Sequence, residues 1–211
     1  MENNTVFVLL AGGKSERMGL DKGLLKYKQT FWILEQLHRI SKTNISTVYI
    51  GLGHNFQHYF DAIHWFENAQ TKFEEFQNLN IKLVLNKHPE LGTFSTLQSV
   101  LKEIKLSNTI ILNPIDIPIL NPIELNKIIN TDNEIIIPHF QGKNGHPIKM
   151  KAGFWKNLIL LNSSDTNARL DFQLKKINPI KISNVEVFDR AILINLNTKK
   201  DWISFLETTI S

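Results

Sequence analysis

The sequence predicts an α/β protein, a Rossmann-like three-layer α/β/α sandwich with a mostly parallel central sheet. Apolar, β-branched runs recur along the first half of the chain, and amphipathic helical patterns separate them. The runs are nearly continuous rather than alternating, which is typical of strands covered on both faces. A glycine-bearing loop directly follows the first run. Strands that alternate with helices in this way favour βαβ units and therefore parallel pairing.

The first half contains the elements on which this prediction depends. The expected strands are Val6–Leu10, Thr47–Ile50, Lys82–Leu85 and Thr109–Leu112, and the expected helices are Phe31–Ile40, Ser95–Ile104 and Pro122–Ile129. Residues 55–79 are rich in aromatic side chains, several of them three or four positions apart. This spacing predicts one or two amphipathic helices packed on the sheet. The histidines of this region are interpreted as surface residues rather than metal ligands; they are His54, His58 and His64.

The second half predicts a β-hairpin followed by further helices and strands. Glu134–Phe140 and His146–Met150 flank a glycine-bearing turn. Two helices are expected next, then two strands and a last helix; the ranges are 152–162, 165–176, 178–184, 191–195 and from Thr198. We expect the hairpin to belong to a small substrate-side insert within a single domain, residues 1–211.

Composition excludes several classes of function. Of the 211 residues, 42% are hydrophobic and 21% charged, which is ordinary for a globular protein. No cysteine is present, so disulfides, thiolate zinc sites, iron–sulfur clusters and a cysteine nucleophile are excluded. The net charge of +4 suits an anionic ligand, but no dense basic stripe predicts nucleic-acid binding. No apolar stretch is long enough to span a membrane, and a cytoplasmic protein is the expectation.

The loop after the first strand is the strongest functional signal. Gly12 and Gly13 lack side chains, so their backbone N–H groups can approach a phosphate, and Arg17 and Lys22 add positive charge. A strand that leads into a glycine-bearing basic loop is how many α/β proteins hold nucleotide phosphates. The loop matches neither the P-loop nor the Gly-x-Gly-x-x-Gly order. The alternative is an ordinary strand-to-helix turn with surface cations.

The segment from Leu10 to Leu25 closely resembles the signature of the MobA-like nucleotidyltransferases. It reads Leu-Ala-Gly-Gly-x-Ser-x-Arg-Met-Gly-x-Asp-Lys-Gly-Leu-Leu. The resemblance implies transfer of a nucleoside monophosphate from a nucleoside triphosphate to an acceptor phosphate, with release of pyrophosphate. It implies that residues 1–120 bind the nucleotide and residues 121–211 the acceptor. In such an enzyme Arg17 would hold the β- and γ-phosphates, Lys22 would contact the α-phosphate, and base and ribose would meet the backbone of Leu10, Ala11 and Gly12.

Asp116 is the second candidate site residue. It follows a hydrophobic strand, and ligands of open α/β sheets bind at the carboxyl ends of the strands. Two flanking prolines keep it out of a helix. A carboxylate there can hold Mg²⁺, which prefers oxygen ligands and nucleotide phosphates. The alternative is an Asx-type turn, but the family resemblance implies the aspartate that binds the catalytic magnesium.

Asn197 is a candidate second ligand for Mg²⁺. It lies in Asn195-Leu196-Asn197-Thr198, which resembles the form of this segment in the guanylyltransferase branch of the family. Its side-chain carbonyl can offer an oxygen to a metal without adding charge. The alternative is that the segment only begins the last helix, with Thr198 as its cap.

Three further residues have two interpretations or rest on weaker similarity. Asn86 is placed to contact base or ribose, and Ser95 to meet phosphate or simply to cap a helix. His146, in Gly-x-x-Gly-His-Pro, either orients the acceptor or pyrophosphate or ends the hairpin. From a Gly-Asp-x-Gly-Ala-Arg segment of the family, only Asp165 and Arg169 match this chain.

The resemblance leaves the donor nucleotide and the acceptor open. The Asn-x-Asn-Thr segment favours GTP and a molybdenum cofactor guanylyltransferase, with a molybdopterin cofactor as acceptor. The Gly-His-Pro segment favours CTP and the cytidylyltransferase branch, and another phosphorylated acceptor is a further alternative. A different class, a nucleotide-binding accessory domain without catalysis, is disfavoured because Gly12, Arg17, Lys22 and Asp116 are all present.

Overall fold

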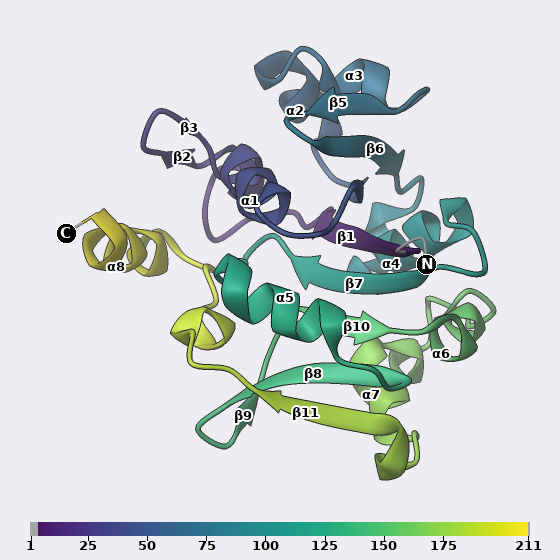
Figure 1. Cartoon of the computed structure of the whole chain (residues 1–211). Coiled ribbons are helices and arrows are strands. Elements are labelled where there is room, and N and C mark those ends of the chain that lie inside the picture. Colours follow the sequence, from purple (N-terminus) through teal and green to yellow (C-terminus); the bar gives the residue numbers. More distant parts are fainter. Residues whose placement is uncertain (1–3, 211) are drawn as a thin grey trace.

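The computed structural model describes residues 4–210 and has a central sheet with helices on both faces (Figure 1). Within these described residues nine strands form the sheet, in the order β11-β8-β10-β7-β1-β4-β6-β5, with β9 paired to β8. The strands are β1 Thr5–Ala11, β4 Thr47–Leu52, β5 Glu74–Phe76, β6 Leu79–Leu85, β7 Thr109–Pro114, β8 Ile135–Phe140, β9 Lys143–Asn144, β10 Ile148–Met150 and β11 Ile182–Glu186. A separate two-stranded hairpin consists of β2 Lys26–Tyr27 and β3 Thr30–Phe31.

Two hydrophobic clusters, one on each face of the sheet, make the three layers. The first cluster takes side chains from α1 Trp32–Ser41, α2 Phe56–Ala62, α3 Phe66–Ala69, α5 Pro122–Asn130 and α8 Lys199–Ile210. The second takes them from α4 Thr93–Glu103, α6 Ala152–Leu158 and α7 Leu170–Lys175. The predicted α/β/α sandwich with a mostly parallel sheet is therefore confirmed.

Strand β1 explains why the strands read as continuous apolar runs. It pairs in parallel with β4 on one side and β7 on the other. Successive side chains of a strand point to opposite faces, and here both faces are buried. Phe7, Leu9 and Ala11 enter the first cluster, whereas Val6, Val8 and Leu10 enter the second.

The aromatic region is only partly helical. After α2 and α3 the chain forms β5, which returns through a turn at Gln77 (φ +57°) and pairs antiparallel with β6. The third predicted strand accordingly begins at Leu79, three residues early. The aromatic spacing is helical up to Phe66, but Phe73 and Phe76 belong to the extended segment, and Phe73 packs edge-on against Tyr49. Tertiary pairing decides the conformation of such short segments.

The predicted strand at 191–195 is wrong. Arg190–Leu193 is a 3-10 helix, and the Asp189 side chain accepts a hydrogen bond from the Ala191 backbone N–H at 2.9 Å. Ala191 and Ile192 are buried against the rest of the fold. A short apolar run does not distinguish a strand from a buried helical turn by periodicity alone. The strand predicted at 178–184 is displaced to β11, after a 3-10 turn over Pro179–Lys181.

The hairpin of the second half extends the central sheet. Strand β10 lies between β8 and β7 and is antiparallel to both. Because Ile148 pairs with Leu112, His146 is carried to the carboxyl end of β7. The two helices that follow are shorter than predicted, as α6 and α7. The sheet register thus places a residue of the second half beside the end of a first-half strand.

Candidate active site

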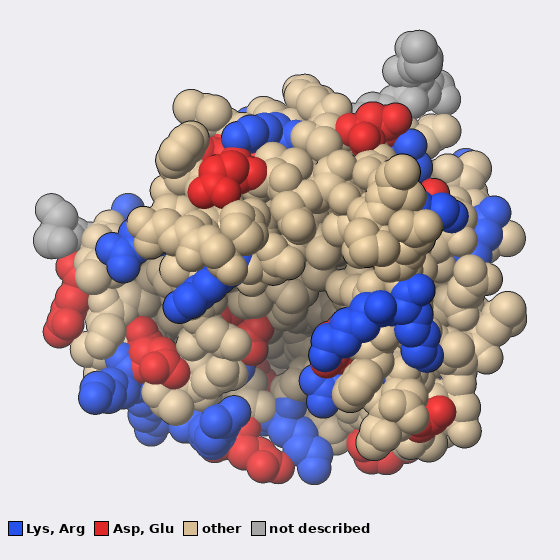
Figure 2. Space-filling view, turned by 90° about the horizontal axis from the view of Figure 1, so that it is seen from below, with Lys and Arg blue, Asp and Glu red and all other residues tan. Residues whose placement is uncertain are grey.

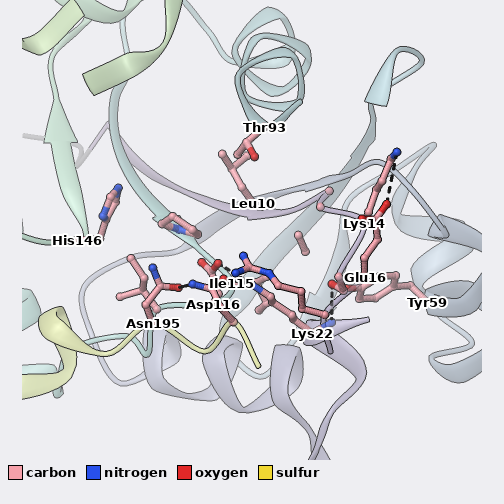
Figure 3. A pocket seen from close by; sticks show the side chains of 18 of the residues that line it. Leu10, Lys14, Glu16, Lys22, Tyr59, Thr93, Ile115, Asp116, His146 and Asn195 are labelled. Carbon is pink, nitrogen blue, oxygen red and sulfur yellow. Dashed lines mark hydrogen bonds and ion pairs between the residues drawn. The ribbon is translucent and has the colours of Figure 1, made fainter. Parts of the chain in front are cut away.

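A cavity of about 750 Å³ opens where β1 and β7 end (Figure 3). The loop after β1 forms one wall, and the segment after β7 together with residues from the second half forms the other. Ten of the residues singled out from the sequence line it: Leu10, Ala11, Gly12, Gly13, Arg17, Lys22, Asp116, His146, Arg169 and Asn197. Tyr59, Thr93 and Asn195 line it as well.

Lys22, Asp116 and Asn197 meet in the middle of this cavity. The Lys22 Nζ donates to Asp116 Oδ2 at 2.8 Å and to Asn197 Oδ1 at 2.7 Å. The Lys22 side chain is 13% exposed and that of Asp116 is 23% exposed, so the ion pair is largely shielded from water. Asp116 and Asn197 lie 94 and 175 residues after Lys22 in the chain, yet both contact its ammonium group.

Backbone hydrogen bonds fix the wall that carries Asp116. The Leu196 N–H donates to the Asp116 carbonyl at 2.8 Å, which ties the Asn197 segment to the Asp116 segment. The Ile115 N–H donates to the Leu10 carbonyl at 2.9 Å. The indole of the fully buried Trp32 donates to the Ile115 carbonyl at 2.8 Å. These hydrogen bonds fix the backbone of the two segments whose side-chain oxygens contact Lys22.

The last helix is capped as predicted, and the cap also positions Asn197. The Thr198 Oγ1 accepts a hydrogen bond from the Asp201 N–H at 3.2 Å. The Asp201 carboxylate accepts in return from the backbone N–H of Thr198 at 2.8 Å and of Asn197 at 3.1 Å, a reciprocal arrangement of the capping-box type. Hydrogen bonds from Thr198 lower the pKa of Asp201 below its usual value. Capping and presentation of the Asn197 side chain to Lys22 therefore coexist.

Gly12 and Gly13 serve the loop in different ways. A Cβ on Gly12 would lie 2.7 Å from Thr96 Oγ1 and 3.2 Å from the Gly53 nitrogen, so α4 and the end of β4 press directly on this backbone. The Gly12 carbonyl accepts from the His54 N–H at 3.3 Å. A Cβ on Gly13 would meet nothing within 4 Å. Gly12 is needed for close packing, whereas Gly13 faces the open cavity.

Helix α2 holds the turn that carries Lys22. The buried Asp21 accepts hydrogen bonds from Asn55 Nδ2 at 3.1 Å and pairs with His58 Nδ1 at 2.7 Å. The Gly23 N–H donates to the Tyr59 hydroxyl at 3.3 Å. Burial, assisted by the Asp21 charge, raises the pKa of Tyr59, which keeps this hydroxyl protonated. The spacing of aromatic residues and histidines in α2 did not predict that this helix holds the Asp21–Gly23 turn. His58 is exposed, as the sequence predicted.

The cations of the β1 loop are more loosely held than Lys22. Lys14 and Arg17 are both exposed, and Lys14 forms only a 3.7 Å ion pair with Glu16. Arg169, from the second half, lines the cavity and donates to Asp171 at 3.1 Å, whereas Asp165 caps a 3-10 turn. On the face seen in Figure 2, Lys and Arg gather around a hollow with Asp and Glu among them. The positive charge of the loop is therefore exposed and interspersed with negative charge.

Asn86 and Ser95 lie behind the cavity wall. The Asn86 amide donates to Ser95 Oγ at 2.7 Å and to Thr96 Oγ1 at 3.0 Å, and its carbonyl accepts from the His88 N–H at 2.9 Å. Ser95 Oγ donates to the Gly92 carbonyl at 2.7 Å. Both side chains are buried, and neither lines the cavity. Ser95 is not a helix cap, because Gly92 occupies that position; the network instead anchors Thr96 beneath Gly12.

His146 lies at the end of the cavity opposite Lys14 and Glu16 (Figure 3). Burial lowers its pKa to about 4, and the nearby Asp116 carboxylate offsets this effect only in part. The imidazole is therefore neutral near pH 7, and it can donate one hydrogen bond and accept another.

The donor atoms in the cavity fit a divalent cation of the Mg²⁺ type. Asp116 Oδ2 and Asn197 Oδ1 both accept from the Lys22 ammonium, so the two oxygens lie close together on one cationic group. Mg²⁺ is commonly held by one or two protein oxygens together with substrate phosphates and waters. In the part of the chain that the structure describes, no group of three or more His, Cys, Asp or Glu side chains is arranged for a metal. A protein-only metal cage is thus absent from residues 4–210.

Among the described residues, no helix combines the length and the apolar character that crossing a bilayer requires.

Comparison with known proteins identifies relatives along most of the chain. The chain is 23% identical over 195 residues to the molybdenum cofactor guanylyltransferase of Xanthomonas euvesicatoria pv. vesicatoria (strain 85-10), covering 92% of this chain and 90% of that protein. It is 24% identical over 201 residues to the probable molybdenum cofactor guanylyltransferase of Aquifex aeolicus (strain VF5), covering 94% and 88%.

Solved structures share the fold. Rv0371c from Mycobacterium tuberculosis H37Rv superposes with a TM-score of 0.75 at 21% identity, covering 96% of this chain and 97% of that one. The same protein solved in complex with manganese gives a TM-score of 0.70 at 18% identity, covering 97% and 99%. The family model of the MobA-like NTP transferase domain matches residues 7–176, so this chain belongs to the MobA-like NTP transferase family.

Proposed function

We propose that this protein transfers a nucleoside monophosphate from a nucleoside triphosphate to an acceptor phosphate and releases pyrophosphate, with GTP as donor and a molybdopterin cofactor as acceptor. The convergence of Lys22 with Asp116 and Asn197 is the observation that carries the proposal. Family membership supports the reaction class, and the two relatives named guanylyltransferases support GTP and the molybdopterin acceptor.

In this proposal the loop wall binds the triphosphate. Arg17 holds the β- and γ-phosphates, and the backbone N–H of Gly13, a residue of the cavity lining, approaches a phosphate oxygen. Lys22 contacts the α-phosphate and stabilises the charge that develops there in the transition state. The backbone of Leu10, Ala11 and Gly12 contacts ribose and base. Asn86 and Ser95 support this edge from behind through Thr96.

The opposite wall, mostly from residues 121–211, positions the acceptor. His146, neutral near pH 7, donates or accepts a hydrogen bond at the acceptor or at pyrophosphate. Bound to Asp116 and Asn197, Mg²⁺ would supply charge neutralisation and a template for the two phosphates; the manganese complex of Rv0371C supports a divalent ion in this fold. No general base is needed because the acceptor phosphate is already ionised. Catalysis is then a matter of placement and electrostatics.

The test is pyrophosphate release from each of the four nucleoside triphosphates, with and without Mg²⁺ and a molybdopterin acceptor. We expect release only when GTP, Mg²⁺ and acceptor are all present. Preference for CTP would move the protein to the cytidylyltransferase reaction. Tight nucleotide binding without any release under every condition would favour the non-catalytic accessory domain and overturn the proposal.

A further inference from the structure

Trp32 begins helix α1 and is fully buried, outside the lining of the main cavity. Its contacts nevertheless reach each of the three segments that meet in the cavity, those of Lys22, Asp116 and Asn197. A side chain that does not line the cavity can affect a ligand only through residues that do line it. Any influence of Trp32 on the chemistry must therefore run through these three segments.

Two of these segments are bound to Trp32 by hydrogen bonds. The backbone N–H of Trp32 donates to the Leu25 carbonyl at 2.8 Å, and the Leu25 N–H donates to the Lys22 carbonyl at 3.3 Å. The indole Nε1 of Trp32 donates to the Ile115 carbonyl at 2.8 Å, in a bond that is buried. Ile115 immediately precedes Asp116 in the chain. One residue thus joins the turn that carries Lys22 to the backbone that carries Asp116.

The same indole ring packs against helix α8, which begins directly after the Asn197 segment. Its centroid lies 5.3 Å from that of Trp202 and 5.2 Å from that of Phe205, and both contacts are edge-to-face. The Trp202 N–H donates to the Thr198 carbonyl at 3.1 Å, and Thr198 follows Asn197 in the chain. The ring contact therefore holds the first turn of α8, from which Asn197 reaches the cavity.

We propose that Trp32 is a positioning residue for the nucleotidyl transfer proposed above, on which this inference rests. It holds the Lys22 ammonium and the two oxygens of the opposite wall at fixed distances from one another. Because the three segments share one buried anchor, their side chains keep this arrangement while each remains able to contact phosphate or metal. A misplacement of about 1 Å at such a site can lower turnover about 10²-fold. The anchor therefore affects catalysis although it touches no substrate.

Trp155 is a matched control, because it makes the same kind of hydrogen bond at the other end of the same strand. It is also fully buried, and its indole Nε1 donates to the Asn108 carbonyl at 2.9 Å. Asn108 precedes the amino end of β7, whereas Ile115 follows the carboxyl end. Replacement of either tryptophan by phenylalanine removes one indole donor and leaves one carbonyl without this partner. Both variants should therefore lose similar stability, with thermal midpoints lowered by about 2–12 °C.

The experiment compares Trp32→Phe and Trp155→Phe in the full chain. Electron paramagnetic resonance gives the Mn²⁺ affinity, and steady-state pyrophosphate release gives kcat and KM for the preferred nucleoside triphosphate. Trp32→Phe should lower Mn²⁺ affinity and kcat each about 10–100-fold, as loss of an indirect partner of a metal commonly does, with KM within about threefold of the wild-type value. Trp155→Phe should leave all three quantities within about threefold, because distant sites act independently.

A second replacement at Trp32 keeps the test decisive if Trp32→Phe does not fold. In β-(3-benzothienyl)alanine a sulfur atom takes the place of the indole N–H, so the ring size is kept and the donor is lost. Mn²⁺ affinity within about threefold of the wild type in this variant overturns the inference.

Equal effects of the two phenylalanine variants on Mn²⁺ affinity and kcat also overturn the inference, because Trp32 would then serve only the stability of the fold. Absence of pyrophosphate release from the wild type defeats the proposed nucleotidyl transfer, while the Mn²⁺ titration still decides whether Trp32 positions the metal-binding oxygens. A wild-type chain that neither binds Mn²⁺ nor releases pyrophosphate defeats both.

Discussion

The two walls of the main cavity are built differently. On the wall after β7, Asp116 and Asn197 are held by main-chain hydrogen bonds and by the Thr198–Asp201 cap. On the loop wall, Lys14 and Arg17 are exposed and have little to restrain them. One wall is therefore preorganised, and we expect a bound ligand to order the exposed cations of the other wall. Preorganised charge stabilises a transition state most, because it needs no rearrangement during the reaction.

Lys22 belongs in sequence to the loop wall, but its ammonium is hydrogen-bonded to Asp116 and Asn197 on the other wall. Its removal should have the largest effect. Lys22→Ala should lower turnover about 10²–10³-fold, the usual cost of losing one preorganised charge. Lys14→Ala, on the same loop, should change turnover only a few fold. Steady-state pyrophosphate release measures both variants. Equal losses of turnover in Lys22→Ala and Lys14→Ala would show that the difference between the two walls does not affect catalysis.

Asp116 tests the rigid wall directly. Asp116→Asn keeps the shape of the side chain but removes its charge, so Mn²⁺ affinity should fall at least about 10–100-fold, the cost of losing even an indirect partner of a metal. Titration of Mn²⁺ by electron paramagnetic resonance gives the affinity. Asp132→Asn, at a side chain 82% exposed, serves as the control. Unchanged affinity in Asp116→Asn would remove this residue from the metal site.

Substitutions of Gly12 and Gly13 test packing and nucleotide binding on the loop wall separately. Gly12→Ala places a Cβ 2.7 Å from Thr96 Oγ1 and should destabilise the fold by about 1–3 kcal/mol, as overpacking commonly does. Gly13→Ala meets nothing within 4 Å, so the free energy of unfolding should change by less than about 0.5 kcal/mol. Its methyl group faces the cavity, however, and should weaken nucleotide binding. Urea unfolding measures the stability of both variants, and calorimetry with GTP measures nucleotide binding. Equal stability of the two variants would contradict the packing role of Gly12.

The smallest effect is expected for His146→Gln, in the pH dependence of the free energy of unfolding. Its pKa in the folded chain is about 4, below the ordinary value of 6.5, so between these values the unfolded chain binds more protons. The stability that the neutral imidazole contributes is therefore complete above pH 6.5 and is lost as the pH falls toward 4. Urea unfolding at several pH values should show that the free energy of unfolding falls less steeply with decreasing pH in His146→Gln than in the wild type. The exposed His64→Gln is the control, and identical slopes in all three proteins would contradict a lowered pKa of His146 in the folded chain.

The motif after β1 and the acid after β7 could be predicted because both are local. A glycine-bearing basic loop and an aspartate held outside a helix by prolines depend on residues close in the chain. The roles of Asn86, Ser95 and His58 could not be predicted in the same way. Asn86 points inward and donates to Ser95 and Thr96, and His58 reaches Asp21 from another element. Such contacts depend on which segments the fold brings together.

By itself the sequence determined the alternation of strands and helices, because a strand buried on both faces must be apolar along its whole length. It also predicted that the first loop, with its glycines and basic side chains, binds phosphate, and this stays a prediction. Only the tertiary structure decided that Arg190–Leu193 is helical, that the hairpin joins the main sheet, and that Lys22 lies between Asp116 and Asn197. Short apolar segments fit several conformations, and the one adopted is set by packing and hydrogen bonds with residues far away in the chain.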